Sequence, residues 1–83
     1  MTFNKVKMIE CSNIESVGYR ELNKEGNLHI DKTFSFNSIR SSPISNITFD
    51  EDTIEIKTRN TKYVFQQPQR KHIWILKTLI LNQ

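Results

Sequence analysis

The chain has 83 residues and a formal net charge of +3, so it is long enough for one domain and too short for a large core. Cys11 is its only cysteine, which excludes an internal disulfide and favours a reducing compartment. No apolar run approaches the roughly 20 residues that a membrane-spanning helix needs, and the residues after Met1 lack the apolar region of a signal peptide. We therefore expect a cytoplasmic protein without membrane association, in which Cys11 packs as a small buried hydrophobe.

The first part of the chain, residues 1–36, predicts a short strand followed by a β-hairpin. The short strand is expected over Lys5–Glu10. The hairpin is expected to run over Ile14–Leu22, to turn where Gly and Asn residues tolerate a positive φ, and to return over Leu28–Phe36. Apolar and polar residues alternate along the return strand, which is typical of a half-buried strand. This alternation places His29 on the outer face, as an ordinary surface residue.

A polar stretch with a proline, residues 37–43, predicts a loop that divides the chain. The following residues, 44–66, predict a three-stranded antiparallel meander, because three alternating segments are separated by an acidic turn and by the two-residue turn Arg59-Asn60. The expected strands are Ile44–Phe49, Thr53–Thr58 and Thr61–Gln66.

The last segment predicts an α-helix over residues 68–82. Pro68 is well suited to the first helical position, where its missing N–H costs nothing. Five residues form one apolar face at helical spacing, namely Ile73, Ile75, Leu76, Leu79 and Ile80. We expect this face to pack on the sheet. The sequence thus predicts one α+β domain over residues 1–83, a small antiparallel sheet of about five or six strands with one C-terminal α-helix packed on it. The expected core combines Ile54, Ile56, Tyr63, Phe65, Ile73, Leu76 and Ile80.

No catalytic motif is present in the sequence: there is no HExxH, GxSxG, P-loop or GxGxxG pattern. His29 and His72 lie in different predicted elements, and neither is near a cysteine at metal-ligand spacing. The run Asp50-Glu51-Asp52 is typical of an acidic β-turn and lacks the pattern of a calcium loop. We therefore expect no catalytic residue, no metal ligand and no cofactor.

Charge is distributed unevenly along the chain. Residues 1–55 contain six basic and nine acidic residues, a net charge of −3, whereas residues 56–83 contain six basic residues and no acid, a net charge of +6. Such an asymmetry indicates an anionic partner. The basic residues of the second part are Lys57, Arg59, Lys62, Arg70, Lys71 and Lys77.

Two clusters within this basic part could bind a partner. On the predicted helix, Arg70, Trp74, Lys77 and Leu81 form one stripe opposite the apolar face. Trp and Arg are enriched at binding hot spots, and a Trp flanked by cations can stack on a base. The alternative is that Trp74 packs on the N-terminal hairpin while the basic residues stay solvated.

The second cluster surrounds the turn of the meander's last hairpin, where Lys57, Arg59 and Lys62 are close in sequence. The functional interpretation is a hairpin tip that contacts phosphate groups. The alternative is a solvated strand edge whose lysines deter aggregation.

The second half of the chain resembles the KTSC domain, a short β-meander with a central Tyr-x-Tyr motif, a proline just after it and then a helix. The resemblance is carried by Ser45–Asp50, by Ile54 and Ile56, and by Tyr63–Pro68. The chain departs from the family pattern because Phe65 stands in place of the second tyrosine and no glycine precedes Tyr63. The resemblance implies a meander followed by a helix, and binding to RNA.

We expect a non-enzymatic binding protein whose contact residues are the six basic residues above together with Trp74 and Leu81. Isoleucine, asparagine and lysine make up 27 of 83 residues, and alanine is absent, which is typical of an AT-rich genome. This composition favours a small accessory protein of a phage or mobile element. It would dock on and modulate, for example inhibit, a host protein or nucleoprotein with an acidic surface, such as an enzyme that handles nucleic acid. The alternatives are direct binding to DNA or RNA, and self-association as a structural homodimer.

Overall fold

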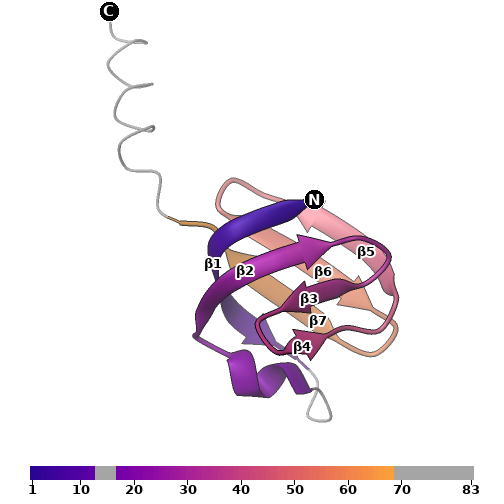
Figure 1. Cartoon of the computed structure of the whole chain (residues 1–83). Coiled ribbons are helices and arrows are strands. Elements are labelled where there is room, and N and C mark those ends of the chain that lie inside the picture. The colour runs from indigo at the N-terminus through magenta and orange to yellow at the C-terminus, as the bar shows by residue number, and fades with distance from the viewer. Residues whose placement is uncertain (13–16, 69–83) are drawn as a thin grey trace, which may run out of the picture.

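Figure 1 shows a computed structural model of the chain, which describes residues 1–12 and 17–68. These residues form a seven-stranded antiparallel sheet with the strand order β4-β3-β2-β1-β7-β6-β5. The elements are β1 (Thr2–Cys11), the 3₁₀ helix η1 (Val17–Glu21), β2 (Glu25–Ile30), β3 (Phe34–Phe36), β4 (Ile39–Arg40), β5 (Ile44–Phe49), β6 (Thr53–Thr58) and β7 (Lys62–Gln66).

β1 is the strand that joins the two halves of the sheet. Its first half pairs with β2 and its second half pairs with β7, and Lys7 takes part in both ladders. A register shift interrupts each ladder, and the first shift includes Lys5, which has a positive φ of 57°. Such bulges bend a strand and increase its twist. As a result, β1 passes from the meander β2–β4 to the meander β5–β7, and the predicted strand at Lys5–Glu10 is part of a longer one.

The predicted N-terminal hairpin differs from the observed one. Residues 17–21, expected in a strand, form η1, and the return strand is divided into β2 and β3 by a turn at Lys32. Leu28 and Ile30 before the turn, and Phe34 and Phe36 after it, are buried, so the predicted alternation of faces continues on both sides of the turn. Leu28 now lies opposite Phe36. The chain folds back here because this arrangement lets inward side chains of two strands bury one another, which a single extended strand cannot do.

The segment predicted as a loop, residues 37–43, contains the short edge strand β4, which pairs with β3. Ile39 is 9% exposed and belongs to the core. The hairpin turn before it uses Asn37 with a φ of 53°, a left-handed conformation that Asn tolerates better than most residues.

The predicted meander over residues 44–66 is confirmed. β5 and β6 have the predicted bounds, and β7 begins one residue later, at Lys62. β6 lies between β5 and β7 and pairs with both of them in antiparallel orientation. The two-residue turn at Arg59-Asn60 joins β6 to β7, and the backbone N–H of Thr58 donates to the carbonyl of Thr61 at 2.9 Å.

The core lies between the two meanders. Phe34 of β3 meets Tyr63 and Phe65 of β7 edge to face, with ring centroids 4.7 and 5.3 Å apart. Phe36 meets Phe65 at 5.1 Å. Cys11 is 6% exposed, which confirms it as a small buried residue. The buried hydrophobic residues are Val6, Met8, Cys11, Leu28, Ile30, Phe34, Phe36, Ile39, Ile54, Ile56, Tyr63 and Phe65, and the four predicted ones among them are confirmed.

The predicted α+β fold is wrong, because the described residues form an all-β domain that contains no α-helix. Apart from Pro68, the predicted helix lies outside the described residues, together with the expected core residues Ile73, Leu76 and Ile80. The prediction assumed that the apolar face of the meander needs a helix to cover it. Instead, the sheet bends at β1, so that the two meanders cover each other. Within the described part of the chain, no helix has the length and apolar character that crossing a membrane requires.

A buried carboxylate connects η1 to the turn between β3 and β4. Glu21 is 6% exposed, and it accepts hydrogen bonds from the Asn37 amide at 3.0 Å and from the Ser38 hydroxyl at 3.2 Å. The Asn37 amide also donates to the backbone carbonyl of Glu25 at 3.3 Å. Gly26 lies against the same amide, and a Cβ atom there would be 2.6 Å from Asn37 Cγ. A side chain at this position would therefore displace the Asn37 amide from its hydrogen bonds.

We predict that Gly26→Ala destabilises the domain by about 1–3 kcal/mol, because the added methyl group displaces the Asn37 amide from Glu21. Urea denaturation followed by circular dichroism measures the change. In an Asn37→Gly background the same substitution should cost less, since the obstructing side chain is gone. Equal costs in the two backgrounds would show that the clash with Asn37 is not the cause.

Phe65 supplies the second stability prediction, since it is fully buried and contacts both Phe34 and Phe36. Phe65→Ala should cost about 3–5 kcal/mol, a large part of the total stability of a domain of this size. Phe49 is a matched control, because it is 51% exposed and its ring meets only that of Phe3 among the described rings. Phe49→Ala should therefore lower the melting temperature far less. Similar losses in both variants would contradict the assignment of the core.

Candidate functional site

The basic residues predicted around the last turn do come together. Lys57 of β6 and Lys62 of β7 are direct cross-strand partners, and both are on the outer face of the sheet. Arg59 is exposed in the turn between them. We call Lys57, Arg59 and Lys62 the basic hairpin end. Five predicted contact residues lie outside the described residues: Arg70, Lys71, Trp74, Lys77 and Leu81.

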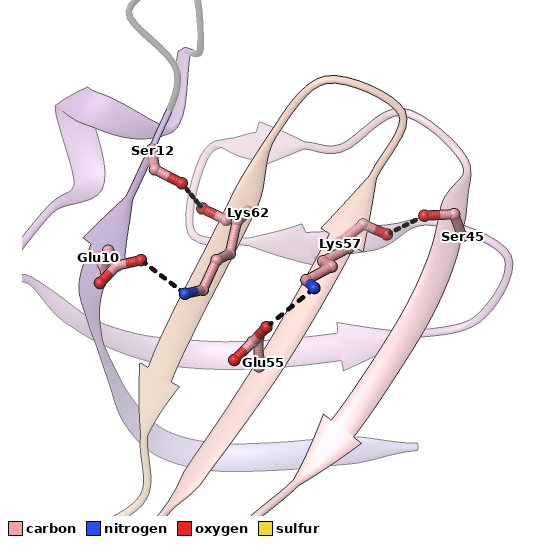
Figure 2. A network of polar contacts seen from close by, with 6 residues as sticks. All are labelled: Glu10, Ser12, Ser45, Glu55, Lys57 and Lys62. Atoms are coloured by element: carbon pink, nitrogen blue, oxygen red, sulfur yellow. Dashed lines mark hydrogen bonds and ion pairs between the residues drawn. The ribbon is translucent and has the colours of Figure 1, made fainter.

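Each lysine of the basic hairpin end has a carboxylate partner (Figure 2). Lys62 Nζ lies 3.3 Å from Glu10 Oε2 on β1, and Lys57 Nζ lies 3.6 Å from Glu55 Oε1 on its own strand. The four side chains are between 32% and 52% exposed. Arg59 forms no ion pair within the described residues. Cations and anions therefore alternate on this surface, and the uncompensated charge belongs to Arg59.

The backbone of the basic hairpin end is held from both sides (Figure 2). The Ser12 backbone N–H donates to the Lys62 carbonyl at 3.0 Å, and the Ser12 hydroxyl lies 3.4 Å from the same oxygen. On the other side, the Ser45 hydroxyl donates to the Lys57 carbonyl at 3.0 Å. Because neighbouring segments of the chain bond to both strands, the lysines are presented from a fixed backbone.

A second polar cluster, which the sequence analysis did not identify, lies on the other meander. Four outer-face residues form a row across β1, β2, β3 and β4, because each is the cross-strand partner of the next: Thr2, His29, Ser35 and Arg40. The row lines an open pocket of about 400 Å³. The turn between β2 and β3, which contains Asp31, Lys32 and Thr33, contributes the rest of its polar lining. We call this the polar pocket.

His29 is exposed, as the sequence predicted, but it is not isolated. Its Nδ1 atom lies 3.1 Å from the Thr2 hydroxyl. The alternation of apolar and polar residues signals that His29 and Ser35 share the outer face. No local pattern signals that Thr2 and Arg40 join them, because their positions depend on the pairing of separate strands.

The described residues contain no cluster of three or more His, Cys, Asp or Glu side chains that could hold a metal ion. The acidic run after β5 forms a turn, in which Asp50 Oδ1 accepts a hydrogen bond from the Glu51 backbone at 2.9 Å and the Asp50 N–H donates to Thr53. The polar side chains of the two clusters described above are lysines, arginines, carboxylates, hydroxyls and an imidazole.

Comparison with known proteins gives no relative from which a function could be transferred. No family model matches the chain, and no curated protein or solved structure matches it. The resemblance to the KTSC domain is therefore unsupported, and so are the expected phage or mobile-element origin and an inhibitory role.

Proposed function

We propose that the chain is a non-catalytic binding domain that docks on an acidic protein or nucleoprotein surface through the basic hairpin end. The observation that carries the proposal is the position of Lys57, Arg59 and Lys62 at one end of one hairpin, in the part of the chain that has no acid after Glu55. The predicted contact residues after Pro68 belong to the same proposal, namely Arg70, Lys71, Trp74, Lys77 and Leu81.

The fixed backbone of the basic hairpin end favours such a role. Association is weakened by the entropy lost when mobile groups become ordered. Here the hydrogen bonds from Ser12 and Ser45 already order the strands that carry Lys62 and Lys57. A partner therefore has to order only the lysine and arginine side chains.

The carboxylates of Glu10 and Glu55 set the strength of the interaction. Ion pairs between exposed side chains contribute only about 0–1 kcal/mol each, so an anionic partner with several charges can replace them. Until it does, they reduce the positive potential of the surface. We therefore expect weak, salt-sensitive binding that depends on how well the partner competes with Glu10 and Glu55.

An acidic protein surface suits the basic hairpin end better than a nucleic acid does. Single-stranded nucleic acids bind proteins largely by stacking bases on exposed aromatic rings. The aromatic residues of the hairpin, Tyr63 and Phe65, are buried in the core. The outer face instead presents Val64, which lies opposite both Glu10 and Glu55. Since the two carboxylates weaken the attraction for any polyanion, the preference for a protein surface rests on the burial of the two rings.

A pair of matched charge variants tests this proposal. Glu10→Gln with Glu55→Gln removes the internal competitors, so binding to an acidic polymer such as polyglutamate should strengthen severalfold. Fluorescence anisotropy over a series of salt concentrations measures the affinity. A DNA duplex and a single-stranded RNA serve as parallel probes. Circular dichroism should show an unchanged fold, since exposed ion pairs contribute little.

The control is Glu51→Gln with Asp52→Asn, which changes the net charge equally at the turn between β5 and β6. That turn lies at the far end of β6, about 17 Å from the basic hairpin end by strand length. The control variant should therefore raise the affinity for polyglutamate only slightly. Equal effects of the two variants, or no binding of polyglutamate at low salt, would reject the proposal. Tighter binding of DNA or RNA than of polyglutamate at the same salt concentration would instead establish direct nucleic-acid binding.

A further inference from the structure

The polar pocket carries cations without internal partners. Lys32 and Arg40 are exposed on its lining, and neither forms an ion pair within the described residues. This differs from the basic hairpin end, where both lysines have carboxylate partners. Asp31 is the only acidic residue of the lining. The pocket therefore has an excess of positive charge that is available to an anionic ligand.

The Thr2 hydroxyl is compatible with a donor role for His29 towards a ligand. The two nitrogens of a neutral imidazole have opposite roles, one as donor and the other as acceptor. When the Thr2 hydroxyl donates to Nδ1 across the observed 3.1 Å, the ring proton is on Nε2. In that tautomer, Nε2–H of His29 is a donor for a ligand.

The row of residues places several donors within reach of one small anion. His29, Ser35 and Arg40 come from three adjacent strands, and adjacent strands lie about 4.8 Å apart. Ser35 therefore lies between His29 and Arg40 on the outer face of the sheet. Arg guanidinium and hydroxyl groups are the donors that proteins use for tetrahedral oxyanions, and the guanidinium can bind two phosphate oxygens at once.

The remaining lining indicates a hydrophilic ligand. Met1 and Ile30 are its only apolar residues, and it contains no Phe, Tyr or Trp ring. Asp31 can accept hydrogen bonds from hydroxyl groups, and it would repel a second phosphate. The pocket volume of about 400 Å³ lies within the range of small-molecule sites.

From these features we infer that the polar pocket binds a phosphate monoester of a small polyhydroxylated molecule, that is, a sugar phosphate. Arg40, Lys32, Ser35 and His29 bind the phosphate group, and Asp31 accepts hydrogen bonds from the sugar hydroxyls. This site is separate from the basic hairpin end and does not depend on the function proposed for it, because it is built on the other meander and shares no residue with it.

Nuclear magnetic resonance titration of the full chain tests this inference, with glucose 6-phosphate, inorganic phosphate and glucose as probes. Glucose 6-phosphate should give saturable shifts of the amide signals of His29, Ser35 and Arg40, inorganic phosphate should bind more weakly, and glucose should not bind. Arg40→Gln should weaken glucose 6-phosphate binding about tenfold, because a charge-assisted contact is lost. Arg20→Gln is the matched control, since Arg20 is an exposed cation of η1 outside the pocket.

Asp31→Asn tests the role of Asp31 in binding the sugar separately from the binding of the phosphate group. Removing this charge should strengthen the binding of inorganic phosphate and reduce the preference for glucose 6-phosphate over inorganic phosphate.

The inference is overturned if no saturable shift occurs, if Arg20→Gln and Arg40→Gln weaken binding equally, or if inorganic phosphate binds the original chain as tightly as glucose 6-phosphate. Lys32→Gln provides a second variant in an exposed turn, should Arg40→Gln disturb β4.

Discussion

The pairing of β1 with both meanders is the constraint on which the rest of the structure depends. Each meander alone would have one apolar face open to water, because its strands alternate between inward and outward residues. The shifts of register along β1 turn these two faces towards each other. The inward residues of β1, among them Val6 and Met8, then lie fully buried beside the aromatic residues of both halves.

The aromatic residues show why this closure suits so small a domain. The ring of Phe34 reaches Tyr63 and Phe65, which are about 30 positions away in the sequence. Aromatic residues bury more area per residue than aliphatic ones, and pairs in edge-to-face contact gain further stabilisation. Four rings from β3 and β7 therefore supply a large share of the core of a chain that has no disulfide.

The two meanders present different chemistry on their outer faces. On β6, β7 and the end of β1, lysines and glutamates alternate and partly cancel (Figure 2). On β2–β4 and the start of β1, hydroxyls, an imidazole and a guanidinium form a row without such cancellation. Net charge alone does not distinguish these surfaces. A cation that is paired with a carboxylate of the same chain attracts an anionic ligand less than an unpaired cation does. The described residues thus present one surface on which both lysines are paired with carboxylates, and another on which Lys32 and Arg40 are not.

The sequence by itself determined which side of β6 and of β7 faces inward. Ile54, Ile56, Tyr63 and Phe65 are buried as their alternation predicted, and the turn at Arg59-Asn60 lies where the pattern placed it. These features are local, since the direction of a side chain in a strand changes with every residue. The basic hairpin end was predictable for the same reason, because a two-residue turn brings Lys57 next to Lys62.

Only the tertiary structure decided which strands are neighbours. The pairing of β1 with β7 brings Glu10 to Lys62, and the pairing of β1, β2, β3 and β4 aligns Thr2 with Arg40 through two residues between them. Neither contact has a local signal, because cross-strand pairs depend on register, and register is set by how the buried faces fit together. The error about a covering helix has the same origin. The regular spacing of apolar residues shows that one face of an element must be buried. The packing of the whole chain decides which element covers that face.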